Sequence, residues 1–206
     1  VGLVSRVGIQ PNDSVRDTGG PMARTVTDVA ILLDAIAGAD ENDPVTLKNK
    51  GHIPKTYTAS LNKNALQGAR LGVLHQVFNA KVTDPRIIEH FDKTIAELKA
   101  AGAEIVDNFV VPEIDSLPRA PQTPARRKAD MIKFLADHPG IPYASPQAMA
   151  DSHLAHPLHQ PNLEAVAAAG PPETDEATIK GLEIESAYRV AFTKAMDAAK
   201  IDAVIF

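Results

Sequence analysis

Three histidines stand at a regular spacing in the sequence SHLAHPLHQ, where they occupy positions His153, His156 and His159. On a continuous helix, spacings of three and six could bring imidazoles together on a metal ion. Pro157 interrupts a helix before the third histidine, and no acidic ligand stands at a suitable offset beyond Asp151. We therefore predict no metal site here, and the role of the three histidines stays open.

The chain also lacks a recognisable nucleophile. It has no cysteine, which excludes thiolate catalysis, disulfides and cysteine-ligated metals. Ser152 directly precedes His153, but neighbours on a helix point apart, so the two form no dyad. Gly19-Gly20 is no phosphate loop, because no lysine follows at the required spacing. The remaining serines stand in no context typical of a nucleophile: Ser5, Ser14, Ser60, Ser116, Ser145 and Ser186.

A turn-rich loop followed by a helix organises the N-terminal stretch. The loop, Gln10–Pro21, is rich in glycine, proline, aspartate and asparagine, which favour tight turns. In the helix predicted over Met22–Ala37, Thr25 or Thr27 should cap the start and Gly38 should give a left-handed stop. Steps of three and four predict one buried face: Val26, Val29, Ala30, Leu33, Ile36 and Ala37. Such a loop forms one wall of a site or is only a connector, and both interpretations stay open.

The same stretch carries a long, ordered set of motifs. They read GLVSR at 2–6, GI at 8–9, DTGGPMARTVTDVA at 17–30, LDAIAG at 33–38 and DP at 43–44. This order resembles the segment just downstream of the nucleophile in amidase signature enzymes. Within that family the chain looks most like the peptide-amidase-like branch and the glutamyl-tRNA amidotransferase branch. Only the middle-to-late portion of the family's sequence is represented.

The resemblance implies a chemistry and two candidate site residues. Amidase signature enzymes hydrolyse amides with a serine nucleophile, a second serine on a cis peptide and a lysine, while backbone N–H groups stabilise the oxyanion. These residues lie upstream of the matched segment, so no catalytic residue is assigned here. Asp17 and Thr18 are the candidates for substrate binding or for orienting neighbouring groups, because their segment returns close to the nucleophile loop in the family. Alternatively, Asp17 only caps local turn amides; Ser5 and Arg6 are expected to be structural.

Two functional hypotheses follow from the resemblance. In the first, the chain is part of an amide hydrolase whose catalytic residues lie outside it, and the chain alone is inactive. In the second, it is a non-catalytic or split subunit of an amidotransferase-like complex that acts by binding and assembly. The implied partners are a small-molecule or peptide amide substrate and the missing remainder of the amidase fold. No cofactor is expected.

Composition narrows the kinds of partner and the cellular location that the chain could have. The 206 residues carry a formal net charge of −5, with acids and bases interspersed, which favours neither nucleic acid nor a membrane surface as a partner. The basic run Arg126-Arg127-Lys128 is expected to be a solvated face. The longest apolar run, Val29–Leu33, is too short to span a bilayer, and no signal peptide is visible. Together with the absence of cysteine, this favours a cytoplasmic location.

Predicted strands and helices alternate along the chain and would position the candidate residues. Segment 39–66 is predicted to be a surface excursion, and 157–172 a loop with a small apolar turn. Strand, helix and strand over 70–111 form a βαβ unit, which implies a parallel pair. Strands are predicted at Val1–Ile9, Arg70–His75, Ala103–Val111 and Asp202–Phe206. Helices are predicted from Pro85 to about Ala101, at Ala125–His138, from Pro146 to about Ala155, and from Thr174 or Asp175 to about Ala199.

This alternation predicts an α/β fold. The resemblance adds a mixed sheet covered by helices, as part of the family's α/β/α arrangement. Both ends of the sequence look cut from a larger fold, since no initiating methionine is present and the last strand ends without a turn. We therefore expect residues 1–206 to be a partial domain.

Overall fold

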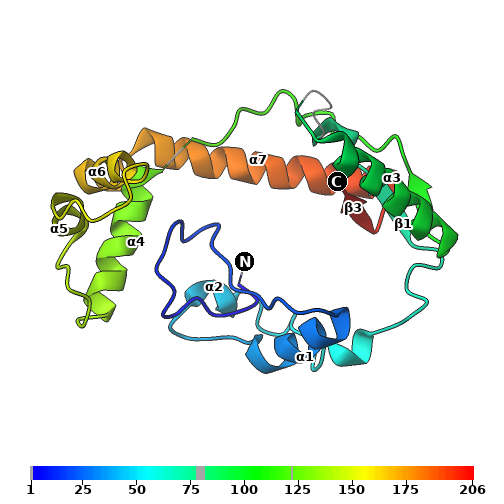
Figure 1. The fold of residues 1–206 in the computed structure, drawn as a ribbon, viewed down its shortest axis with the longest axis horizontal. Coiled ribbons are helices and arrows are strands. Elements are labelled where there is room, and N and C mark those ends of the chain that lie inside the picture. The colour runs from blue at the N-terminus through cyan, green and yellow to red at the C-terminus, as the bar shows by residue number, and fades with distance from the viewer. Residues whose placement is uncertain (1, 78–81, 122) are drawn as a thin grey trace. The chain divides into compact units, whose positions relative to one another are not determined.

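The computed structural model describes residues 2–77, 82–121 and 123–206. It divides the chain into two compact units, each assembled from two segments that are far apart in sequence (Figure 1). The first unit comprises Val1–Leu61 and Pro121–Gly181, and the second comprises Asn62–Ala120 and Leu182–Phe206. The predicted α/β class is confirmed by the helices and the small parallel sheet.

The first unit is built from short helices whose starts follow the expected capping chemistry. Its helices are α1 (Val26–Ile36), α2 (Pro44–Leu47), η1 (Thr58–Ser60), α4 (Pro124–Asp137), α5 (Pro146–Asp151) and α6 (Gln160–Ala168). The Thr25 side chain accepts a hydrogen bond from the N–H of Asp28, and Ser145 accepts one from Ala148. Four of these helices, α2, α4, α5 and α6, carry proline in the first turn, where the missing N–H breaks no hydrogen bond.

Helix α1 differs from its prediction in three respects. It begins at Val26 and ends at Ile36, and its C-cap residue Ala37 has extended backbone where a left-handed Gly38 was predicted as the stop. The predicted buried face is largely uncovered in this chain: Ala30 is buried, whereas Val26 is 75% exposed and Ile36 is 43% exposed. The apolar periodicity therefore predicts the helix correctly, but it does not predict how much of its apolar face is buried within this chain.

Two other local predictions for this unit are wrong. The predicted strand Val1–Ile9 is absent: Val4 makes a single antiparallel bridge to Ala37, and Val1 lies outside the described residues. The segment 157–172, predicted as a loop, contains helix α6. Segment 39–66 holds α2 and η1, and Thr46 within it is fully buried.

The second unit contains a three-stranded parallel sheet in the order β2-β1-β3. Its elements are β1 (Arg70–Val73), η2 (His75–Val77), α3 (Pro85–Ala100), β2 (Glu104–Val106), the larger part of α7 (Glu176–Ala199) and β3 (Ala203–Ile205). In the central strand, Leu71 pairs with Ile105 on one side and with Ala203 on the other. The predicted βαβ unit is thus confirmed, and the three strands pair only in parallel where a mixed sheet was expected.

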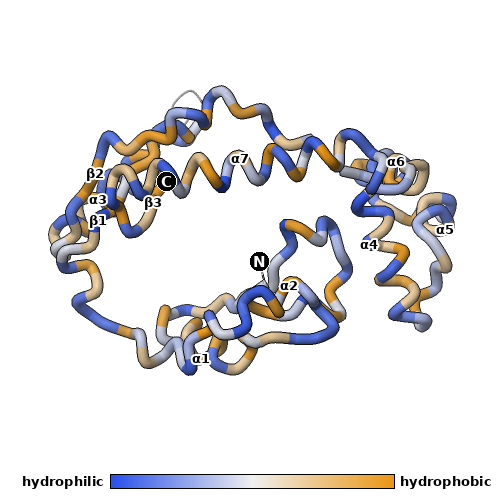
Figure 2. The backbone as a smooth tube through the Cα atoms, turned by 180° about the vertical axis from the view of Figure 1, so that it is seen from behind, coloured by the Kyte–Doolittle hydropathy of each residue, from blue (hydrophilic) through white to orange (hydrophobic). Residues whose placement is uncertain are grey.

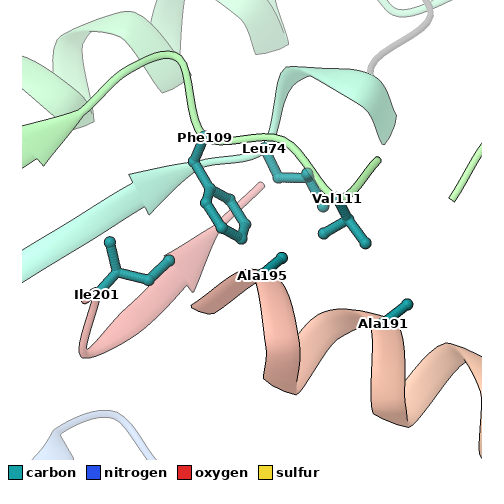
Figure 3. Close-up of a cluster of buried hydrophobic side chains, with 6 residues drawn as sticks. All are labelled: Leu74, Phe109, Val111, Ala191, Ala195 and Ile201. Carbon is teal, nitrogen blue, oxygen red and sulfur yellow. The ribbon is translucent and has the colours of Figure 1, made fainter. Parts of the chain in front are cut away.

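The core of the second unit lies between the sheet and α7. Figure 3 shows Ala191 and Ala195 of α7 facing Phe109, Val111 and Leu74, with Ile201 beside them. Small residues on α7 let the helix backbone approach these larger side chains closely. Apolar and polar residues alternate along α7 in Figure 2, as expected for a helix with one covered side. Among the described residues, no helix is both long and apolar enough to cross a membrane.

Candidate functional site

A cavity of about 430 Å³ opens in the first unit, in the size range of small-molecule sites. Several residues between Arg6 and Asp17, together with residues 42–43, form one part of its wall, and one face of α4 forms the other. The α4 residues lie at steps of three and four, which places them on one side of the helix. The lining consists of Arg6, Val7, Gly8, Ile9, Pro11, Ser14, Asp17, Asn42, Asp43, Asp130, Lys133, Phe134, Asp137 and His138.

Asp17 lines this cavity and also shapes its own loop. Its Oδ2 accepts hydrogen bonds from the backbone N–H groups of Asn12 and Asp13, both at 2.8 Å. The local capping role considered from the sequence is therefore present, and it holds the carboxylate at the cavity wall. Thr18 is exposed, its hydroxyl donates to the carbonyl of Gly19 at 3.2 Å, and it is not among the lining residues.

A buried ion pair fixes the base of the loop. The Arg6 guanidinium donates from Nε to Oδ2 of Asp43 at 2.9 Å and from NH2 to Oδ1 at 2.7 Å, and the Arg6 backbone N–H adds a third bond at 3.1 Å. Ser5 donates to Asp40 Oδ2 at 2.6 Å. The hydrogen bonds from Arg6 lower the pKa of Asp43 to about 2, although burial opposes this shift. Hydrogen bonding to Asp43 likewise raises the pKa of Arg6.

This shift predicts a specific acid dependence of stability. The folded-state pKa of Asp43 lies below its ordinary value of 3.8, so its contribution is fully present above about pH 4 and is lost as the pH falls towards about 2. A shift of this size corresponds to about 2 kcal/mol. Urea unfolding of the chain between these pH values should show this loss, and Asp43→Asn should remove it. An unchanged pH dependence in Asp43→Asn would contradict the assignment.

The α4 side of the cavity supplies charges of both signs and one aromatic stack. Asp130 Oδ2 accepts from the N–H of Ser14 at 3.0 Å, and Lys133 pairs with Asp137 at 2.5 Å. Phe134 stacks on His138 with ring centroids 4.2 Å apart. The lining thus combines charged side chains of both signs with an apolar part formed by Val7, Ile9, Pro11 and Phe134. Such a mixture suits recognition of a polar small molecule or a peptide segment.

Ser14, the serine of this lining, contacts its neighbours through the backbone. Its N–H donates to Asp130, and its carbonyl accepts from Arg6 NH1. A nucleophilic serine needs its hydroxyl bonded to a base that takes the proton. No hydrogen bond of this kind is seen for Ser14 among the described residues.

The basic run on α4 is not the solvated face that the sequence predicted. Arg126 is only 6% exposed and pairs with Asp13 at 2.7 Å. Arg127 NH1 donates to Asn162 Oδ1, and Lys128 Nζ donates to the carbonyl of Ala169 at 2.6 Å. The run resembles a surface patch because its partners come from distant parts of the chain, which local sequence cannot indicate.

The three regularly spaced histidines do not converge. The rings of His156 and His159 are tilted, with centroids 6.0 Å apart, and His153 has a positive φ of 51° beyond the end of α5. Across residues 2–77, 82–121 and 123–206, no three His, Cys, Asp or Glu side chains gather into a group that could hold a metal ion.

Known proteins resemble this chain in both sequence and fold. The family model described as Amidase matches residues 1–206. A 108-residue region is 40% identical to a putative amidase of Arthroderma benhamiae, covering 52% of this chain and 18% of that protein. A 104-residue region is 44% identical to a glutamyl-tRNA(Gln) amidotransferase chain of Pseudomonas fluorescens, covering 50% of this chain and 20% of that protein. The chain therefore matches about one fifth of the length of these relatives.

Two solved structures cover nearly the whole chain. The native peptide amidase from Stenotrophomonas maltophilia aligns with a TM-score of 0.78 and 30% identity, over 98% of this chain and 42% of that one. The peptide amidase PAM in complex with the competitive inhibitor chymostatin aligns with a TM-score of 0.73 and 28% identity, with the same coverage. More than half of each of these chains lies outside the aligned region.

Proposed function

This chain belongs to the amidase family, and on that premise we propose that it is part of an enzyme that hydrolyses a carboxamide and releases ammonia or an amine. The reaction would use a serine nucleophile, a cis-serine and a lysine in polypeptide outside residues 1–206. The single observation that carries the proposal is the family match along residues 1–206. The absence of cysteine from this chain is compatible with action in the cytoplasm.

In this proposal the cavity beside Asp17 forms part of the substrate-binding wall. Asp17, Asp130 and Arg6 offer hydrogen-bonding groups, while Ile9, Pro11 and Phe134 offer apolar surface. Such a lining suits an amide whose acyl part carries both polar and apolar groups, as in a peptide. The name of the Stenotrophomonas maltophilia structure, peptide amidase, supports this substrate class.

An ammonia-release assay tests the proposed activity. The protein at its natural length would be offered small aliphatic amides, aryl amides and C-terminal peptide amides, with the 206-residue chain assayed in parallel. We expect the natural-length protein to release ammonia from at least one class and the chain alone to release none. Release from no amide by the natural-length protein would overturn the proposal.

Asp17 gives a prediction about this wall. In the natural-length enzyme, Asp17→Ala should lower kcat by about tenfold, or about 1.4 kcal/mol, because the loop loses the acceptor that shapes it and the cavity loses a carboxylate. Asp17→Asn keeps an acceptor oxygen and should retain more activity. Thr18→Val is the control and should behave as wild type, because Thr18 does not line the cavity. An unchanged kcat in folded Asp17→Ala would remove Asp17 from the site.

A second candidate function is that of a component which works by binding and assembly. Its support is the 44% identity to a protein whose name places it in a glutamyl-tRNA(Gln) amidotransferase. Purification under native conditions, followed by the intact mass of every component, separates the two candidates. A stoichiometric second chain, without which no ammonia is transferred, favours assembly; a single active chain favours the hydrolase.

A further inference from the structure

We propose that helix α4 positions the cavity wall through two side chains, Arg126 and Asp130, which together hold the loop that carries Asp17. We call this pair the α4 clamp. The inference rests on the proposed function only where it concerns activity; the mechanical part concerns the loop itself. In this account Arg126 is a positioning residue that acts through Asp13 and Asp17.

The first contact of the α4 clamp is a buried ion pair. Arg126 NH2 donates to Asp13 Oδ2 at 2.7 Å, and the two residues are 6% and 8% exposed. They are separated by 113 positions in the sequence. Removing one partner of a charge pair this far from water is costly. Without Arg126, the Asp13 carboxylate would keep, among the described residues, only Arg16 NH1, at 3.7 Å, and the N–H of Val15, at 3.1 Å.

The second contact lies one helical turn further along α4. Asp130 Oδ2 accepts a hydrogen bond from the N–H of Ser14 at 3.0 Å. Residues four apart on a helix are neighbours on the same face. Arg126 therefore holds the side chain of Asp13 while Asp130 holds the backbone of the next residue. Arg126 binds a carboxylate and Asp130 binds a backbone N–H. If the loop shifted by one residue along α4, neither side chain would face a group that it can bind, so the two contacts hold the loop in one position.

The contact continues from Asp13 to Asp17 through the backbone. The N–H of Asp13 donates to Asp17 Oδ2 at 2.8 Å, and the N–H of Asp17 donates to the carbonyl of Asp13 at 2.8 Å. Asp13 is thus bonded to Arg126 by its side chain and to Asp17 by both of its backbone polar groups. Fixing Asp13 fixes the position of the Asp17 carboxylate.

The arrangement separates the holding residues from the cavity. Asp17 and Asp130 line the cavity, but Asp13 and Arg126 do not. A ligand in the cavity would therefore touch Asp17 without touching Arg126. An effect of Arg126 on ligand recognition must pass through the loop, which distinguishes positioning from direct contact.

Amide hydrogen exchange in the 206-residue chain tests the mechanical part. In Arg126→Met the amides of Asn12 and Asp13, which bond to Asp17, should exchange about tenfold faster or more than in wild type. Arg126→Lys keeps the charge and should restore part of the protection. The matched control is Arg127→Met, the neighbouring arginine on α4, whose partner is Asn162 and not the loop. It should leave both loop amides unchanged.

Kinetics of the natural-length protein test the functional part. Arg126→Met should lower kcat/KM by about tenfold and Arg127→Met should not, with Arg126→Lys in between. Unchanged exchange of the loop amides in Arg126→Met, or an equal change in Arg127→Met, would overturn the α4 clamp. Faster exchange in a protein that hydrolyses no amide would support the clamp and overturn the proposed function instead. Amide hydrolysis with unaltered kcat/KM in Arg126→Met would overturn the positioning role.

Discussion

Replacing Asp43 with alanine is expected to lower the free energy of unfolding by about 3 kcal/mol, the lower end of the usual loss for a buried ion pair, because Arg6 is only partly buried and keeps the Ser14 carbonyl as an acceptor. The side chains of Arg6 and Asp43 are 14% and 6% exposed. Arg6 donates to Asp43 through Nε, NH2 and its backbone N–H, so the substitution leaves three donors without this acceptor. The same carboxylate also caps α2 by accepting from Val45. Urea unfolding of the chain at pH 7 measures the loss.

Asp84→Ala is a matched control for this substitution. Asp84 also precedes a proline, also caps a helix and also pairs with an arginine, Arg86. It differs in exposure, because the Arg86 side chain is 88% exposed and stays solvated when the pair is broken. The control should therefore lose much less stability than Asp43→Ala, because it gives up a helix cap and little from the exposed ion pair. If Asp43→Ala and Asp84→Ala lowered the free energy of unfolding equally, burial of the Arg6–Asp43 pair would not explain its contribution to stability.

Replacing Gly72 with alanine is expected to destabilise the second unit by about 1–3 kcal/mol through overpacking. Gly72 lies in the central strand β1, and a Cβ there would stand 2.5 Å from Ile201 Cδ1 and 2.8 Å from Phe109 Cγ. Phe109 is only 4% exposed and belongs to the core, so its ring has little room to move. The denaturation midpoint of the chain should fall accordingly.

A double-mutant cycle tests whether the steric contact with Ile201 causes this loss. Ile201→Val deletes the Cδ1 atom that the new methyl group would meet, so Gly72→Ala should cost less in that background. Gly140→Ala is the matched control, because nothing lies within 4 Å of a Cβ at that position. Additive losses in the cycle, or wild-type stability of Gly72→Ala, would show that the core accommodates the methyl group.

Features set by neighbouring residues could be predicted from the sequence. The predicted cap Thr25 acts as expected, because it bonds an amide only three residues away. Asp84 and Ser145 cap α3 and α5 in the same local way. The βαβ unit over 70–106 was predictable for the same reason, since periodicity and a Gly102 with positive φ mark its elements locally. Helix α6 was missed because Pro161 and the flanking prolines resemble loop punctuation, although proline in a first turn is compatible with a helix.

Features set by distant residues could not be predicted. Arg126 was expected in solvent, yet its partner Asp13 stands 113 positions earlier and lies beside it only in the folded chain. Likewise, Asp130 accepts a hydrogen bond from Ser14, which stands 116 positions earlier in the sequence. In the candidate site, Asp17 lines the cavity and Thr18 next to it is exposed, and a role of either residue in substrate binding stays a prediction. No local pattern in the sequence indicates which of these two neighbours lines the cavity.

We propose, above all, that this amidase-family chain is part of an amide hydrolase whose catalytic residues lie outside residues 1–206. The most direct test labels the natural-length protein with a serine-directed phosphonate and locates the adduct by peptide mass spectrometry. We expect a single modified serine outside residues 1–206, with loss of ammonia release in proportion to labelling. An adduct on a serine within residues 1–206 that abolishes activity would contradict it.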